Sequence, residues 1–185
     1  MVTVGIDEVG RGCFAGPVVA CAVIMPEGYA DPRIIDSKKI TEKKREVIAE
    51  SIRRNAVDYA FGVVCNQVID QINILRATKQ AMHIALSRLK TPYDNIIVDA
   101  VRLNVSVPIE NPFKAEDSHM CVAAASILAK VYRDSMMKKL HMTYPEYGWY
   151  SNKGYGAKVH LDALKKYGAT ELHRMSFLKN ADIKR

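Results

Sequence analysis

Three strand-like apolar runs in the first 65 residues most constrain the fold of this chain. They are "VTVGID" (residues 2–7), "PVVACAVIM" (residues 17–25) and "VDYAFGVVC" (residues 57–65). Apolar runs this short, bounded by turn residues such as Pro26 and Gly28, are typical of buried strands. A fourth run, "NIIVDA" (residues 95–100), is apolar and ends in an acid, which predicts a short central strand.

Helical patterns alternate with these runs. A helix is predicted to begin near Thr41, which is a suitable N-cap residue. Its apolar side is formed by Val47, Ile48 and Ile52. Residues 72–89 are also helical in pattern, and residues 119–140 give the strongest signal because they contain many Ala and no Gly or Pro. A last helix over residues 157–167 ends at Gly168. This order of elements predicts an α/β fold, in which helices flank a mixed central β-sheet.

The composition fits one compact domain that binds a polyanion. The chain has 185 residues, 49% of them hydrophobic, and a net charge of +7. We expect a single domain over residues 1–185, with residues 141–185 as a helical C-terminal extension. The positive charge favours nucleic acid as the partner over a membrane. No signal peptide is recognisable and no run reaches the roughly 18 apolar residues of a membrane span, so we expect a cytoplasmic protein. The four cysteines lack a CxxC spacing and are expected to be buried thiols.

Acidic residues stand at the ends of two predicted strands. Asp7 and Glu8 follow the apolar residues of the first run, and Asp99 follows those of the fourth. Adjacent strand residues point to opposite faces, so both carboxylates of the pair converge only if the chain bends there, which Gly10 and Gly12 make easy. Clustered acids are costly unless a cation neutralises them, and Mg²⁺ or Mn²⁺ prefers hard oxygen ligands. Each acid alone is equally compatible with a capping or salt-bridged role, but together they favour a metal site.

A further acid is expected just before the Ala-rich helix. Glu116 and Asp117 both stand there. Because acids at a helix start are favoured by the helix dipole, a capping role competes with a metal-binding role for each of them. Asp134 lies seventeen residues beyond Asp117, which is about 25 Å along a continuous helix. Two metals in a nuclease site are only about 3.5–4 Å apart. We therefore exclude Asp134 from this site and expect it to pair with a neighbouring cation.

Seven motifs resemble, in order, those of the ribonuclease HII family. They are "GIDEVGRG" (residues 5–12), "DSKK" (36–39), "INILRAT" (72–78), "VDA" (98–100), "AAASILAKVYRD" (123–134), "NKGYGAKVHLDAL" (152–164) and "YGATELHRMSF" (167–177). Any one motif is a weak signal, but together they cover nearly the whole chain. The resemblance implies an RNase H-like fold and an endoribonuclease that cleaves the RNA strand of RNA–DNA hybrids. It also implies incision 5′ to single ribonucleotides embedded in duplex DNA.

The resemblance implies a catalytic site of four acids and two divalent ions, Mg²⁺ or Mn²⁺. Hydrolysis at such a site leaves 3′-hydroxyl and 5′-phosphate ends. Asp7, Glu8 and Asp99 match three of the four acids. The motif around the fourth acid departs from the family, which usually has Lys-Gly-Asp or Lys-Ala-Asp where this chain has "KAED" (residues 114–117). An ungapped register puts Glu116 in the acid's position and Asp117 one beyond it. We favour Glu116 as the fourth metal ligand and keep Asp117 as the alternative.

The resemblance also implies how the ribonucleotide is recognised. Backbone groups of Gly10, Arg11 and Gly12 approach the sugar and read its 2′-hydroxyl. Tyr155 packs on the deoxyribose that follows, at the RNA–DNA junction. Taken alone, Tyr155 would read as an ordinary half-buried aromatic residue. The family usually has Pro after this tyrosine, whereas Gly156 stands here and makes the loop more flexible.

Several polar residues are expected to contact the phosphates of the substrate. This group contains Lys38, Lys39, Arg45, Asn73, Lys153 and Arg174. Without the resemblance, Asn73 would read as a helix cap and the cations as solvated surface charges. As a group the cations predict strong salt dependence of binding. His160 and His173 match family positions, and we expect them to be structural.

Two other function classes compete with the endonuclease. A catalytically silent hybrid-binding module would share the fold, but a carboxylate cluster repels phosphate and is of no use to it. A junction resolvase would have no use for a ribose-reading element. The expected partners are RNA–DNA hybrids and ribonucleotide-containing duplex DNA. Replication or repair proteins stay open as partners, because the tail "NADIKR" (residues 180–185) has no clear sliding-clamp motif. We expect a monomer.

Overall fold

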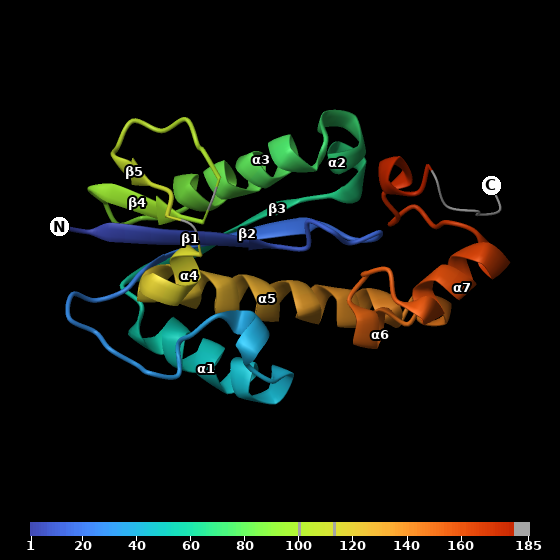
Figure 1. The fold of residues 1–185 in the computed structure, drawn as a ribbon, viewed down its shortest axis with the longest axis horizontal. Helices are drawn as coiled ribbons and strands as arrows, with labels where there is room; N and C mark the ends of the chain where they lie inside the picture. The colour runs from blue at the N-terminus through green and yellow to red at the C-terminus, as the bar shows by residue number, and fades with distance from the viewer. Residues whose placement is uncertain (100, 113, 180–185) are drawn as a thin grey trace.

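A computed structural model describes residues 1–99, 101–112 and 114–179. Within these ranges, a mixed sheet of five strands lies between two layers of helices (Figure 1). The strand order is β3-β2-β1-β4-β5. This architecture confirms the predicted α/β class with a mixed sheet flanked by helices. No helix in the described ranges is long and apolar enough to cross a membrane.

The first three strands form an antiparallel meander. They are β1 (Thr3–Val9), β2 (Val18–Ile24) and β3 (Asp58–Val64), which confirms the three predicted runs. The expectation that Asp7 and Glu8 follow the first strand was wrong. Both residues lie inside β1, because β2 continues alongside and pairs Asp7 with Cys21 and Glu8 with Ala20. The chain bends only after Val9, at Gly10, whose φ is 90°.

The remaining two strands run parallel to β1. β4 (Asn95–Val98) pairs with β1, and β5 (Ile109–Glu110) pairs with β4. The last residue of β4, Val98, stands opposite Ile6, so β4 ends before it reaches Asp7. Asp99 therefore leaves the sheet beside the acidic end of β1. The sequence did not indicate β5, which is only two residues long.

Helices cover both faces of the sheet. In Figure 1, α2 (Asn66–Ile72) and α3 (Ile74–Ser87) lie on one side, and α1 (Glu42–Asn55), α4 (Ala115–Ser118) and α5 (Met120–His141) lie on the other. The predicted helix over residues 72–89 corresponds to α3, whereas α2, which ends where that prediction begins, was not predicted. The two helices meet at Asn73, which adopts a φ of 70° and whose side chain accepts a hydrogen bond from the backbone N–H of Arg76. Of the predicted apolar side of α1, Ile48 and Ile52 are buried but Val47 is 59% exposed.

Helix α5 packs very closely on β1, and this contact positions much of the site. A Cβ atom at Gly5 would lie 2.2 Å from the carbonyl carbon of Cys121, so glycine is required where the strand crosses the helix. The cores on the two sides of the sheet follow the alternation of the strands. Ala20 belongs to the core beneath α3, whereas Cys21 belongs to the core beneath α1 and α5. Three cysteines are buried or half-buried, but Cys65 is exposed, contrary to expectation.

The C-terminal segment packs against the far end of α5. It contains η2 (Pro145–Tyr147), α6 (Trp149–Asn152), α7 (Lys158–Tyr167) and η3 (Met175–Phe177). A separate apolar cluster joins Trp149 and Leu164 of this segment to Met137 of α5 and Ala15 of the β1–β2 loop. The segment therefore touches both α5 and the loop that follows β1, although the chain between them is long. Residues 180–185, where we looked for a clamp-binding motif, lie outside the described ranges.

Candidate active site

A cavity of about 280 Å³ opens at the end of β1. It brings together eight of the residues expected to form the active site: Asp7, Glu8, Gly10, Arg11, Gly12, Lys38, Asp99 and Tyr155. These residues come from β1, the β1–β2 loop, η1 (Ser37–Lys39), the end of β4 and the loop after α6. Four further residues line it: Val9, Ser37, Ser126 and Lys130.

The carboxylates of Asp7 and Glu8 leave β1 on opposite faces of the sheet. Residues directly opposite each other in a sheet share a face, and Asp7 stands opposite Cys21 while Glu8 stands opposite Ala20. Asp7 thus faces the α1 and α5 side, and Glu8 faces the α3 side. Both still reach the same cavity because β4 has already ended, so that edge of β1 has no neighbouring strand there.

The carboxylate of Glu8 is largely buried, and only one of its two oxygens has a partner among the described residues. Burial raises the pKa of its carboxyl group, Arg11 lowers it, and the neighbouring charge of Asp99 raises it again, so that the net shift is upward. One carboxylate oxygen, Oε1, lies 3.2 Å from Nη1 of Arg11. The other, Oε2, is buried and has no hydrogen-bond partner among the described residues. A buried oxygen without a partner, next to a second carboxylate, is a position that a divalent cation would satisfy.

Asp99 connects the end of β4 to the start of α4. Its Oδ1 accepts a hydrogen bond from the backbone N–H of Lys114 at 3.0 Å and a longer one, at 3.5 Å, from that of Ala115. The two candidates for the fourth acid, Glu116 and Asp117, come next in the chain, within α4. Their side chains lie outside what the structure describes. Among the described His, Cys, Asp and Glu side chains, with Asp7, Glu8 and Asp99 included, no group of three or more is arranged to hold a metal ion.

The two glycines of the Gly-Arg-Gly motif have different surroundings. Gly10 has a φ of 90°, and a Cβ atom there would lie 2.2 Å from Nε of Arg133. At Gly12, by contrast, an added Cβ atom would meet nothing within 4 Å. Packing within the protein therefore explains why residue 10 is glycine. It does not explain why residue 12, which lines the cavity, is glycine.

Tyr155 forms part of the cavity wall and is 39% exposed. Its ring lies among cations, with Nζ of Lys130 and Cζ of Arg133 at 5.8 and 5.9 Å from the ring centroid. Burial raises the pKa of its hydroxyl to about 12. A tyrosine hydroxyl is protonated at neutral pH in any case, so it can donate a hydrogen bond there. Its backbone carbonyl accepts a hydrogen bond from Nδ1 of His160 at 2.8 Å.

His160 and His173 are structural, as we expected. Both are buried, and their Nε2 atoms lie 3.0 Å apart. Nδ1 of His173 accepts the backbone N–H of Thr170, so its Nε2 carries the proton that His160 accepts. Burial lowers the pKa of both rings, that of His173 to about 4. Trp149 also donates to Nε2 of His160, at 3.2 Å, which completes a neutral buried network behind Tyr155.

The cations expected to contact phosphates occupy three kinds of position. Lys38 lines the cavity, whereas Lys39 lines a neighbouring groove beside α1. The expectation of a phosphate contact does not fit the other three, because Arg45, Lys153 and Arg174 are buried. Arg174 is fully buried and donates to the backbone carbonyls of residues 10, 11 and 16. Asn73 caps α3.

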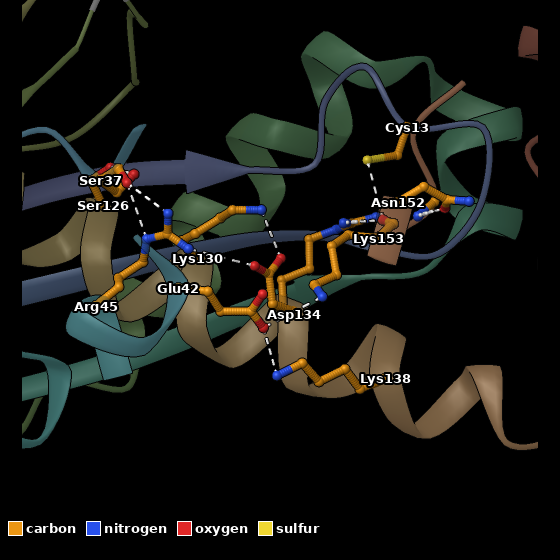
Figure 2. Close-up of polar contacts among 12 residues, drawn as sticks. Cys13, Ser37, Glu42, Arg45, Ser126, Lys130, Asp134, Lys138, Asn152 and Lys153 are labelled. Carbon is orange, nitrogen blue, oxygen red and sulfur yellow. Dashed lines mark hydrogen bonds and ion pairs between the residues drawn. The ribbon is translucent and has the colours of Figure 1, made fainter. Parts of the chain in front are cut away.

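Asp134 pairs with cations, as we predicted. Its carboxylate lies 2.7 Å from Nζ of Lys130 and 3.8 Å from Nη1 of Arg45 (Figure 2). It thereby holds Lys130 beside the cavity. The sequence reasoning missed Lys130 and Ser126, although their spacing of four residues puts both on one face of α5. Ser126 also contacts Ser37, with 2.9 Å between the two hydroxyl oxygens.

Comparison with known proteins identifies the family. The family model of ribonuclease HII matches residues 4–180. The ribonuclease HII of Bacillus cytotoxicus is 47% identical over 179 residues, which are 97% of this chain and 69% of that protein. The crystal structure of the ribonuclease H2 from Pyrococcus horikoshii has a TM-score of 0.85 and 26% identity, covering 98% of this chain and 97% of that one.

A second solved structure, the PCNA:RNase HII complex from Archaeoglobus fulgidus, has a TM-score of 0.82 and 25% identity. That match covers 99% of this chain and 97% of the archaeal one. The match to the family model over nearly the whole chain agrees with the order of the seven motifs, and the structural matches confirm the RNase H-like fold. The chain therefore belongs to the ribonuclease HII family, whose members are metal-dependent endonucleases that cleave RNA in RNA–DNA hybrids and act in ribonucleotide excision.

Proposed function

We propose that the cavity at the end of β1 is the active site, at which this chain cleaves the ribonucleotide-containing strand. Two divalent ions, Mg²⁺ or Mn²⁺, would be held there by Asp7, Glu8, Asp99 and Glu116. The observation that carries this proposal is the buried Oε2 of Glu8 beside Asp99, which has no hydrogen-bond partner among the described residues. Held by these carboxylates, two ions would supply an activated water molecule for in-line attack and would stabilise the charge on the leaving oxygen. Asp117 is the alternative to Glu116, because both follow the backbone N–H groups that bind Asp99.

The protein's own groups orient the substrate around those ions. Gly12 leaves open space on the cavity side, so the backbone of residues 10–12 can approach the ribose and read its 2′-hydroxyl. The protonated hydroxyl of Tyr155 can donate to the same sugar, and its ring can pack on the next deoxyribose. Incision then falls on the 5′ side of the ribonucleotide and leaves 3′-hydroxyl and 5′-phosphate ends.

Cations around the cavity are proposed to hold the phosphates. Lys38 and Arg11 line the cavity, and Lys39 extends the positive charge along η1 toward Lys43 and Lys44 of α1. Arg11 pairs with Glu8 at 3.2 Å. Ion binding at Glu8 would weaken that pair, which frees Arg11 to contact a phosphate.

Organisation and partners follow the same proposal. Residues 1–185 act as one domain, and the C-terminal extension over residues 141–185 carries Tyr155 to the cavity. The relative from Archaeoglobus fulgidus is in complex with PCNA, so a sliding clamp is the first partner to test for this chain, although its tail lacks a clear clamp motif. We propose a monomer as the active state.

One incision assay tests the proposal. The substrate is a duplex DNA with a single ribonucleotide, compared with an all-DNA duplex and assayed with Mg²⁺, with Mn²⁺ and with EDTA. Asp7→Asn should abolish cutting and retain binding. Asp162→Asn on the exposed side of α7 is the matched control and should cut normally, because Asp162 lies outside the cavity. If the unmodified protein binds the ribonucleotide-containing duplex without cutting it, or cuts the all-DNA duplex equally well, the proposal is overturned.

A further inference from the structure

Two fully buried arginines hold the loop that connects β1 to β2. Arg174 donates to the carbonyl oxygens of Gly10, Arg11 and Gly16, at 2.7, 2.8 and 3.0 Å. Arg133 donates from Nε and Nη2 to the carbonyls of residues 17 and 15, at 2.8 and 3.0 Å. All three nitrogens of each guanidinium group thus reach a backbone carbonyl, since Nη1 of Arg133 binds residue 153 at 2.8 Å.

Neither guanidinium group forms an ion pair within the described part of the chain, although Asp70 lies near enough to raise the pKa of Arg174. Such an arrangement is unusual, because a buried charge is costly unless it is paired. Burial lowers the pKa of Arg174 to about 10. A guanidinium group has five N–H donors in a fixed planar arrangement, and the carbonyls around each group supply its hydrogen-bond acceptors here. An apolar side chain would be cheaper to bury but could not fix the loop.

The same contacts join the loop to the segment that carries Tyr155. Arg133 binds the carbonyl of Lys153, and the backbone N–H of Phe14 donates to the carbonyl of Gly154 at 2.8 Å. The thiol of Cys13 also lies against the carbonyl of Lys153 (Figure 2). On the other side, the backbone N–H of Arg174 donates to the carbonyl of Phe14 at 2.8 Å. Hydrogen bonds therefore link the Gly-Arg-Gly backbone to the residues next to Tyr155.

We propose that Arg174 and Arg133 are positioning residues that fix the spacing between the backbone of residues 10–12 and Tyr155, and that this spacing sets how well the ribonucleotide is aligned for incision. The inference rests on the proposed function, in which those two elements read the sugar. It gives Arg174 a role through the protein's own carbonyls, in place of the phosphate contact that the sequence suggested. Removing the hydrogen bonds that these arginines donate to the loop should therefore reduce the turnover rate and leave substrate affinity nearly unchanged.

The test compares Arg174→Met, which removes every donor, with Arg174→Lys, which keeps a cation with three donors. Arg88→Met is the control, because Arg88 also donates to a carbonyl, that of Phe61, but is exposed and distant from the cavity. Each variant is assayed for kcat and KM on duplex DNA with one ribonucleotide. Trp149 is the only tryptophan of the chain and is fully buried. Its fluorescence emission therefore reports whether the packing of the C-terminal segment is intact.

We expect Arg174→Met to lower kcat by on the order of 10- to 100-fold, because a misplacement of about 1 Å has effects of this size. KM should change less than about threefold, Trp149 emission should be unchanged, and Arg174→Lys should recover part of the rate. An increase in KM with unchanged kcat would mean a phosphate contact and would overturn the proposal. Loss of Trp149 emission in parallel with activity in both variants would also overturn it.

Failure of this inference is distinguishable from failure of the proposed function. If the unmodified protein does not incise at the ribonucleotide, or if Asp7→Asn still cuts, the proposed function is wrong. If the unmodified protein cuts, Asp7→Asn does not, and both Arg174 variants keep normal kcat, only the positioning role is wrong. Should Arg174→Met fail to fold, the kcat and KM of Arg174→Lys decide the question alone.

Discussion

Gly10 and Gly12 form a matched pair within one motif, and alanine at each should have opposite effects on stability. At Gly12 the φ lies outside the left-handed region and an added Cβ meets nothing within 4 Å. Replacing such a glycine stabilises a protein by about 0.4–1 kcal/mol, because the unfolded chain loses freedom. At this chain length that corresponds to a rise in Tm of about 1–4 °C.

At Gly10 the same substitution should destabilise the protein strongly. A φ of 90° is strained for alanine, which costs about 1–3 kcal/mol. The Cβ atom would also lie 2.2 Å from Nε of Arg133 and displace it. Loss of one charge-assisted hydrogen bond from Arg133 adds about 1.5–3 kcal/mol. The sum of about 2.5–6 kcal/mol predicts a fall in Tm of at least roughly 5 °C.

Incision should respond differently from stability. If the sugar approaches the backbone at Gly12, the methyl group of Gly12→Ala stands in its path and costs about 1–3 kcal/mol of overpacking. This loss corresponds to roughly a 5- to 150-fold decrease in kcat/KM on duplex DNA with one ribonucleotide. The measurements are thermal unfolding and steady-state incision with the same preparations. A Gly12→Ala variant that is stable and as active as the unmodified protein would refute the reasoning, and so would a Gly10→Ala variant with an unchanged Tm.

Three further predictions concern titratable groups and the fourth acid. Burial raises the pKa of Glu8, so ionisation of its carboxyl group lowers the stability of the protein above that pKa. In EDTA at pH 8, Glu8→Gln should therefore have a higher Tm than the unmodified protein, and the difference between the two Tm values should shrink as the pH falls toward 4. A difference in Tm that does not depend on pH would contradict this. The pKa of His173 is lowered to about 4, so the free energy of unfolding should fall as the pH drops from 6.5 toward 4. His173→Gln should flatten that slope, and an unchanged slope measured by denaturant titration would count against the buried network. Finally, Glu116→Gln should abolish incision while Asp117→Asn retains it; the reverse result in the incision assay would show that the register is wrong.

Much of the fold could be predicted because local patterns and tertiary packing agree in it. The buried strands β2 and β4 and the long helix α5 have patterns that no neighbouring element overrides. The end of β1 could not be predicted, because its polar residues stay in the strand only through pairing with β2. The boundary between α2 and α3 at Asn73 could not be predicted either, because the apolar pattern continues across it. Only the side-chain cap of Asn73 and its φ of 70° separate the two helices.

Site residues could be predicted where the residue type itself indicates the chemistry, as it does for a carboxylate. They could not be predicted where the role of a residue depends on partners far away in the sequence. Asp7, Glu8, Asp99 and Tyr155 line one cavity as the motifs suggested. The role of Arg174 could not be predicted, because the sequence does not distinguish a buried arginine that binds carbonyl groups from an exposed one that binds phosphate. Its carbonyl partners lie near the other end of the chain and are brought together only by the fold.

The central claim is that the carboxylates at the end of β1 hold the ions that the reaction requires. Anomalous diffraction from crystals soaked with Mn²⁺ tests it most directly. We predict two Mn²⁺ peaks in the cavity, within about 2.0–2.6 Å of carboxylate oxygens. One of these oxygens should be Oε2 of Glu8, which lacks a described partner, and another should belong to Asp99. Soaked crystals of an enzyme that is active with Mn²⁺ but binds the ion elsewhere, with Glu8 still paired only to Arg11, would contradict the account.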